Sequence, residues 1–341
     1  MEFLSNSENR ARPLNLKIKN LSPLSLYIGN GNQALEIAVF SSNSKPASGL
    51  LQQAFKERKS GRAVPVLVVV AYPSGTSICG TGGDHPPIFH CKDLDQAKRL
   101  CESALKQSNR NAAIHFLSDS MPSLETLLPG IANEGLFSSH ELTHGTKKRS
   151  DWLSASESAK KILGKSKNDL ITGLGFQTKT IDNLTDLLTV DEERTALAVL
   201  LKDQEIPEIS NDRFNNMSPV SYALTKADKE KLPWVIMVKG DRMRLYNTKN
   251  IGIGRRGRTE TYIECQLSLM ATKDIGLIWM LFSSEALKDG GTINFIIEES
   301  KRFAADVADK LRDRIYDVVV PEISMGIVKA QNLPCPSRDE I

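Results

Sequence analysis

The sequence predicts an α/β protein with two α/β domains and a long C-terminal helix. A chain of 341 residues is long enough for two domains of ordinary size, each with its own core. The first half alternates short apolar runs with segments of helical spacing, and the second half runs in the order helix, three strands, helix, strand. We expect an N-terminal domain over 1–147, a second domain with the C-terminal helix over 148–330, and a tail over 331–341.

Strands and helices alternate along the first domain. The run over 64–72 is rich in valine and has the length of a buried strand, and it is too short to cross a bilayer. The segment 95–107 spaces its apolar residues like a helix with one buried face. Further strands are expected at 24–28 and 34–40, around a Gly-Asn turn at 29–32, and further helices at 49–59, 112–118 and 124–128.

The second domain is expected to begin with a helix over 154–172, which glycines at 173 and 175 end. The last element is an amphipathic helix from Asn294 to about Val319. Pro321 should break it, because proline lacks a backbone N–H and clashes with the preceding turn. The elements between are strands at 176–181, 186–190 and 195–202, a helix at 219–231, and strands at 234–238 and 242–246.

Composition and charge exclude several classes of protein. Hydrophobic residues make up 40% of the chain and charged residues 25%, as in soluble globular proteins. The N-terminus lacks the basic-then-apolar order of a secretion signal, so we expect a cytoplasmic protein with no membrane partner. Because the net charge is only +3, affinity for nucleic acid must come from local clusters. Five cysteines without a CxxC pair favour reduced thiols over a disulfide frame or a zinc knuckle.

The segment from His140 to His144 matches HExxH, the zinc-protease pattern in which two histidines bind the metal and the glutamate, here Glu141, polarises water. That chemistry needs both histidines inside a stable helix. Gly145 follows at once and a basic run occupies 147–149, so His144 would lie at a fraying helix end. A third ligand is also missing. We interpret the match as coincidental and expect no metal there.

The segment 252–258 contains GxGxxG, but no helix follows that could offer its N-terminus to a phosphate, so a dinucleotide site is not expected. Its arginines, Arg255, Arg256 and Arg258, lie on a glycine-rich loop. Guanidinium groups bind phosphate oxygens in pairs, and glycines let a backbone come close, so the loop is a candidate contact for DNA. A solvated basic loop is the alternative.

A magnesium-dependent restriction nuclease places an aspartate on one strand and an acidic-x-Lys trio on the next, so that two carboxylates hold the metal. Here Asp186 begins one strand and Lys202 ends the next, within the order of elements expected for the second domain. We therefore expect a core like that of the PD-(D/E)xK restriction endonucleases. The acidic position is Leu200, which cannot bind a cation, although acidic residues at 203–205 could supply a displaced carboxylate. We expect the core to be inactive.

Aromatic residues accompany two basic ones in this domain. Trp234 and Tyr246 flank Lys239 and Arg244, and exposed aromatic rings at such positions could stack on bases. Aromatic residues at strand positions more often belong to a core. We expect both rings to be buried.

Several phrases together resemble a known family. They are ICG at 78–80, PP at 86–87, LPGIANEGLF at 128–137 with HEL at 140–142, SDW at 150–152, SPVSYAL at 218–224, LPWVI at 232–236, RLY at 244–246, and the stretch 311–321. These phrases resemble the N-terminal region of large bacterial adenine-specific DNA methyltransferases, the restriction-modification and phage-defence proteins in which the methylase is fused to other modules. The resemblance covers most of residues 60–330. It implies attachment to a DNA-modifying machine, and within its phrase His144 is not required.

The chain departs from a complete methylase. Adenine methylases hold the flipped base with an Asn/Asp/Ser-Pro-Pro-aromatic tetrad and bind the methyl donor with a glycine-rich loop. The segment 84–88 (DHPPI) is out of register and ends in isoleucine. We therefore expect no cofactor in this piece, the methyl donor only on a methylase domain outside it, and magnesium only if the nuclease-like core were active.

The function expected from the sequence is that of an N-terminal module of a restriction-modification protein. Its partners would be double-stranded DNA, contacted through Arg255, Arg256 and Arg258, and the methylase domain of the same longer protein. One alternative is an active magnesium-dependent endonuclease with Asp186 and Lys202 in its site. A second is a protein-interaction scaffold of a phage-defence complex, and a third is a zinc peptidase.

Overall fold

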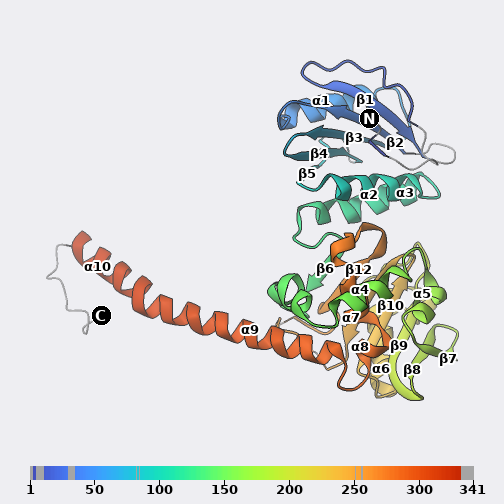
Figure 1. Cartoon of the computed structure of the whole chain (residues 1–341), viewed down its shortest axis with the longest axis vertical. Helices are drawn as coiled ribbons and strands as arrows, with labels where there is room; N and C mark the ends of the chain where they lie inside the picture. Colours follow the sequence, from blue (N-terminus) through green and yellow to red (C-terminus); the bar gives the residue numbers. More distant parts are fainter. Residues whose placement is uncertain are drawn as a thin grey trace.

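The computed structural model describes residues 3–4, 11–29, 35–81, 83, 85–249, 251–254 and 256–331. Most of the turn expected at 29–32, together with Asp84, Arg255, Cys335 and nearly all of the expected tail, lies outside these residues. The described residues form a mixed α/β structure with two sheets, ten α-helices and a long C-terminal helix (Figure 1). The predicted α/β class and the long last helix are confirmed.

The first sheet has five strands in the order β1-β2-β3-β4-β5. Strands β2 and β3 are parallel and are connected through helix α1 (Ser48–Lys59), and the other pairs are antiparallel. The five strands are β1 (Ser22–Ile28), β2 (Glu36–Ser41), β3 (Val66–Tyr72), β4 (Gly75–Gly80) and β5 (Ile88–Cys91).

Helices cover both faces of the first sheet. Val66, Val68 and Val70 of β3 pack into the core beneath α1, whereas Leu67 and Val69 pack into the core of the opposite face. Burial on both faces explains why β3 is a continuous apolar run instead of an alternating one. Helices α2 (Leu94–Leu105) and α3 (Arg110–Ser120) form the second layer and lie between the two sheets (Figure 1).

The second sheet has seven strands in the order β6-β12-β11-β10-β9-β8-β7. Only the neighbours β9 and β10 are parallel, and helix α6 (Pro219–Lys229) connects them. The strands are β6 (Ile131–Glu134), β7 (Gln177–Asp182), β8 (Thr185–Val190), β9 (Glu193–Leu200), β10 (Trp234–Lys239), β11 (Arg242–Asn247) and β12 (Tyr262–Gln266). Strand β6 joins this sheet from a part of the chain that precedes the boundary expected at 147.

Alternate residues of the central strands enter two cores. Val235 and Met237 of β10 pack beneath α6, and Trp234, Ile236 and Val238 pack on the opposite face. That opposite face is covered by α4 (Trp152–Lys160), α5 (Lys167–Gly173), α7 (Gly276–Phe282), α8 (Ser284–Leu287) and the start of α9 (Thr292–Arg314). Trp234 and Tyr246 are buried, which confirms that their rings belong to the core.

The single helix expected over 154–172 is instead two helices, α4 and α5. The chain turns between them at Gly164, whose φ of +82° lies in the left-handed region that favours glycine. Apolar periodicity continues across the break because Ile162, like Leu170 and Ile171, packs into the same core. For that reason the pattern does not reveal the interruption.

The C-terminal helix does not end before Pro321, contrary to the expectation. Helix α9 passes through a π-helical turn (Ile315–Val319) into α10 (Val320–Ala330). Within that turn the Val320 amide donates to the Ile315 carbonyl, five residues back. A widened turn relieves the clash between a proline ring and the preceding carbonyls, so the helix continues. Beyond its first turns it projects away from the rest of the molecule (Figure 1).

Polar contacts join the two halves where α3 meets the second sheet. The Ser120 hydroxyl donates to Gln266 Oε1 at 3.1 Å, and Arg242 pairs with Asp119 at 3.4 Å. Leu269 also enters the core of the first half.

Among the described residues, no helix combines the length and apolar character needed to cross a membrane. The described cysteines, at 79, 91, 101 and 265, are buried and free, as the sequence indicates.

Candidate functional site

The predicted nuclease positions lie at one end of the second sheet. Asp186 and Leu200 are on the neighbouring strands β8 and β9, whereas Lys202, expected to end the second strand, lies two residues beyond β9. Asp186 of β8 is paired with Ala198 of β9, so this carboxylate is close to the end of β9, just before Lys202. Leu200 ends β9 opposite Val238, and its side chain packs against the core on the α7 face. The structure thus brings the aspartate and the start of the Lys202 segment together, with an aliphatic side chain between them.

Of the acidic residues that the sequence offered at 203–205, Asp203 is exposed and Glu205 has other partners. Glu205 is buried; it accepts a hydrogen bond from the Lys202 amide at 2.8 Å and pairs with Arg213 at 2.5 Å. Arg213 also donates to the Leu200 carbonyl at 3.1 Å. Glu205 therefore stabilises the chain as it leaves β9. Within the described ranges, no group of three or more His, Cys, Asp or Glu residues is arranged to hold a metal ion.

The arginine loop, residues 248–261, lies at the other end of the sheet. It follows Asn247, which pairs with Trp234 at the amino end of β10, whereas Leu200 pairs near the carboxyl end of that strand. Arg256 pairs with Glu134, and Arg258 with Asp228 at 2.7 Å. Arg255 lies outside the described residues. The candidate DNA contact and the nuclease-like positions are therefore not adjacent.

The glycines of this loop have a structural reason. The Gly254 amide donates to the Gly135 carbonyl at 3.0 Å, and a Cβ on Gly252 would lie 2.5 Å from the same oxygen. The GxG pattern at 252–254 thus permits close packing against the end of β6. This contact holds the base of the loop, and beyond it Arg256 is exposed and Arg258 is partly exposed.

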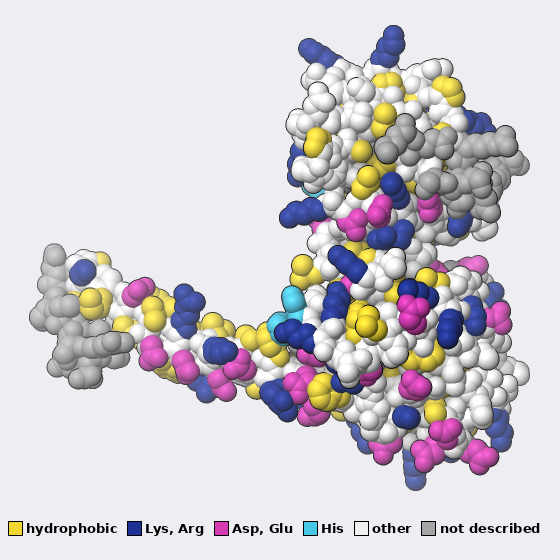
Figure 2. All heavy atoms as spheres, in the orientation of Figure 1, with side chains coloured by type: hydrophobic (Ala, Val, Ile, Leu, Met, Phe, Trp, Pro, Cys, Tyr) yellow, Lys and Arg dark blue, Asp and Glu magenta, His cyan; other side chains and the backbone are white. Residues whose placement is uncertain are grey.

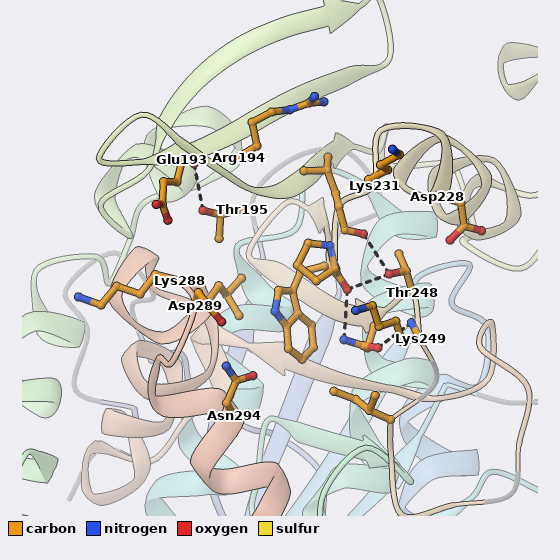
Figure 3. A pocket seen from close by; sticks show the side chains of 16 residues that line it. Glu193, Arg194, Thr195, Asp228, Lys231, Thr248, Lys249, Lys288, Asp289 and Asn294 are labelled. Carbon is orange, nitrogen blue, oxygen red and sulfur yellow. Dashed lines mark hydrogen bonds between the residues drawn. The ribbon is translucent and has the colours of Figure 1, made fainter.

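A cavity of about 640 Å³ opens beside the loop at the amino ends of β9 and β10 (Figure 3). Its charged side chains stand around the rim, and Asp228, the partner of Arg258, forms part of the wall. The ammonium groups of Lys231, Lys249 and Lys288 make no ion pair with any described residue. Three acidic side chains, those of Glu193, Asp228 and Asp289, also line the cavity.

The HExxH segment packs against α9. Glu141–Gly145 form a π-helical turn, in which the His144 ring stacks on that of His140 with centroids 5.2 Å apart. His140 in turn stacks on Phe303 of α9, with centroids 4.2 Å apart. Burial raises the pKa of Glu141, and the nearby charge of Glu299 raises it further. The two rings thus contribute stacked contacts to the base of the long helix.

The rim lysines were not singled out from the sequence. Lys231, Lys249 and Lys288 belong to three segments that are brought together only by the fold. No spacing pattern links residues so far apart, and no local signal identifies them.

Comparison of the chain with protein-family models, with curated proteins and with solved structures found no match.

Proposed function

We propose that this chain is the DNA-contacting N-terminal module of an adenine-specific DNA methyltransferase of the restriction-modification kind. The observation that carries the proposal is the sequence of elements α5, β7, β8, β9, α6, β10, with β9 and β10 parallel and the rest of that strand group antiparallel. This is the arrangement expected of a PD-(D/E)xK core. The position of Asp186, beside the end of β9, supports the same interpretation, and the resemblance of the sequence phrases supplies the methyltransferase context.

The proposed core binds DNA without cleaving it. Hydrolysis of a phosphodiester by this type of site requires two carboxylates on one magnesium ion. Leu200 takes the place of the second carboxylate. Of the two acidic residues that follow, Asp203 is exposed and Glu205 is paired with Arg213. Asp186 alone leaves such a metal with too few anionic ligands.

DNA contact is assigned to the amino end of β10, where the arginine loop and the cavity rim meet. Surface ion pairs such as those of Arg256 and Arg258 contribute no more than about 1 kcal/mol each, so phosphate oxygens can replace Glu134 and Asp228 as their partners. Nearby lysines on the rim extend the positive charge along the same surface. A modest net charge is compatible with this arrangement, because the contact is local.

The test is duplex binding followed by fluorescence anisotropy over a series of salt concentrations. The triple variant Arg255→Ala, Arg256→Ala, Arg258→Ala should reduce the slope of log K against log salt by about 0.9 for each phosphate that the arginines neutralise. Replacing three exposed arginines of the projecting helix, Arg302, Arg312 and Arg314, provides a control of equal charge. An unchanged slope in the loop variant, or an equal loss in the control, would show that the loop is not the contact surface.

The methylase domain is assigned to the apolar stripe of the projecting helix. Near the body, Ile293 and Ile297 are buried. Farther along the helix the apolar side chains of Leu311, which is 58% exposed, Ile315 and Ile323 are exposed. Apolar side chains lie among charged ones along this helix (Figure 2). A soluble helix with such a stripe packs against another apolar surface. The proposed occupant is the methylase domain of the longer protein.

A further inference from the structure

A second charged cavity, of about 330 Å³, lies at the carboxyl end of β10. It is at the opposite end of the sheet from the arginine loop, and β10 contributes Met237, a residue of the core beneath α6. Three basic residues, Lys239, Arg242 and Arg244, line it together with three acidic ones, Asp119, Glu208 and Glu264. The cavity is therefore built from β10, β11 and β12, the connection before α6, and α3 of the first half.

Strand register explains why the basic residues share one face. Lys239 pairs with Arg242 and Met237 pairs with Arg244, so all three cationic side chains leave the sheet on the side of α6. The tight turn between the strands includes Gly240, whose φ of +59° lies in the left-handed region. A two-residue turn thus places Lys239 directly beside Arg242.

The ion pairs within the cavity are unequal. Arg244 is paired with both Glu264 and Glu208, and Glu264 is only 14% exposed, so this pair is fixed in the wall. Arg242 has looser partners, Asp119 at 3.4 Å and Glu264 at 3.6 Å. Asp119 is 54% exposed and belongs to the end of α3. It can rotate into solvent without disturbing the sheet.

Lys239 differs from its neighbours because its ammonium group makes no hydrogen bond or ion pair with the described residues. The side chain is half-buried. Burial lowers the pKa of Lys239, and the adjacent positive charge of Arg242 lowers it further, against the smaller opposing effect of Asp119. A half-buried cation without a partner, facing a cavity, is an incomplete anion site.

The position of the cavity also favours a ligand. Strands β9 and β10 are parallel and connected by α6, and ligands of α/β sheets bind beyond the carboxyl ends of such strands. Small-molecule sites also occur where two structural units meet, as α3 and the second sheet do here. The volume exceeds that of a single small anion, so there is space for a larger molecule that carries the anionic group.

We propose that this cavity binds a phosphate group, which Lys239 and Arg242 hold while Asp119 leaves Arg242 for solvent. Arg242 offers a planar pair of donors and Lys239 a point charge, the combination that suits a tetrahedral dianion. Arg244 stays with Glu264 and keeps the wall in place. The phosphate can come from free phosphate or a small phosphorylated compound, or from the 5′ end of a nucleic-acid strand.

Isothermal titration with inorganic phosphate tests the site on the full chain. Lys239→Met should weaken binding roughly tenfold, because it removes a charge-assisted hydrogen bond to the anion. Asp119→Asn should strengthen it by about threefold, because it removes the carboxylate that competes for Arg242. Lys179→Met, at an exposed position of edge strand β7, should change nothing. Unfolding midpoints of the four proteins identify any variant that fails to fold.

Weaker binding by Lys239→Met together with stronger binding by Asp119→Asn cannot arise from a purely structural ion-pair network. In such a network both substitutions would weaken phosphate binding, or neither would change it. Absence of phosphate binding to the unmodified chain overturns the proposal, as does equal binding by all variants or weaker binding by Asp119→Asn. A 5′-phosphorylated oligonucleotide that binds more tightly than both its unphosphorylated form and inorganic phosphate identifies a nucleic-acid end. Equal affinity identifies the free anion. The arginine-loop variant should retain phosphate binding, so this proposal and the DNA-contact proposal fail independently.

Discussion

The turn that presents Asp186 depends on one carboxylate, and its contribution to stability can be calculated. Asp182 accepts hydrogen bonds from the amides of Leu184 and Thr185 and from the Thr185 hydroxyl, and it pairs with Lys226 at 2.9 Å. Desolvation by burial opposes ionisation, but the Lys226 ammonium and these donors lower the pKa of Asp182 from 3.8 to about 2. The pKa of Lys226 is raised, mainly by its hydrogen bond to Asp182, in agreement.

Asp182→Asn should destabilise the domain at neutral pH by between about 1 and 2 kcal/mol. The shift is nearly two pKa units at about 1.4 kcal/mol each, and solvent screening of a carboxylate that is 29% exposed reduces the total. Because the folded pKa is lowered, this stability is present above the unfolded pKa near 4 and is lost as the pH falls through about 2. The asparagine variant should therefore be less sensitive to pH between these values.

Urea unfolding followed by tryptophan fluorescence measures this difference. All three tryptophans, Trp152, Trp234 and Trp279, lie on elements of the second sheet and its helices, so the signal reports on the part that contains Asp182. Glu157→Gln, which removes an exposed pair with Lys160, is the matched control and should have no measurable effect. Equal stability of Asp182→Asn and the unmodified protein at neutral pH would refute the reasoning. A deficit that stays the same down to pH 2 would refute it equally.

Three further outcomes are expected. As the pH rises, phosphate affinity should begin to fall at a lower pH than it would with a lysine of ordinary pKa, because the pKa of Lys239 is lowered. Titration calorimetry over a pH series measures this. Gly252→Ala should lower the free energy of unfolding by about 1–3 kcal/mol and weaken duplex binding. The control Gly257→Ala, where there is open space for a Cβ, should have neither effect. Unfolding and fluorescence anisotropy measure the two effects. Leu311→Glu with Ile323→Glu should preserve the unfolding midpoint but abolish capture of a purified methylase domain; capture by this variant would contradict the assigned surface.

Local pattern accounts for most of the second half. The strands β7 to β10 and the crossover helix α6 lie close to their expected positions, since each buries one or two faces and spaces its apolar residues accordingly. Strand β6 is not predicted by the sequence pattern. It is short, and its pairing with β12 joins segments more than a hundred residues apart.

The sequence by itself determined the α/β class, the order of elements around Asp186 and Leu200, and the burial of Trp234 and Tyr246, because periodicity and side-chain chemistry act within a few residues. Tertiary structure alone decided that the helix passes Pro321, that the loop glycines pack against the end of β6, and that Lys239 meets Asp119 at a cavity. These features arise where distant segments come into contact. The free energy of such contacts depends on the completed fold, so no local pattern encodes it.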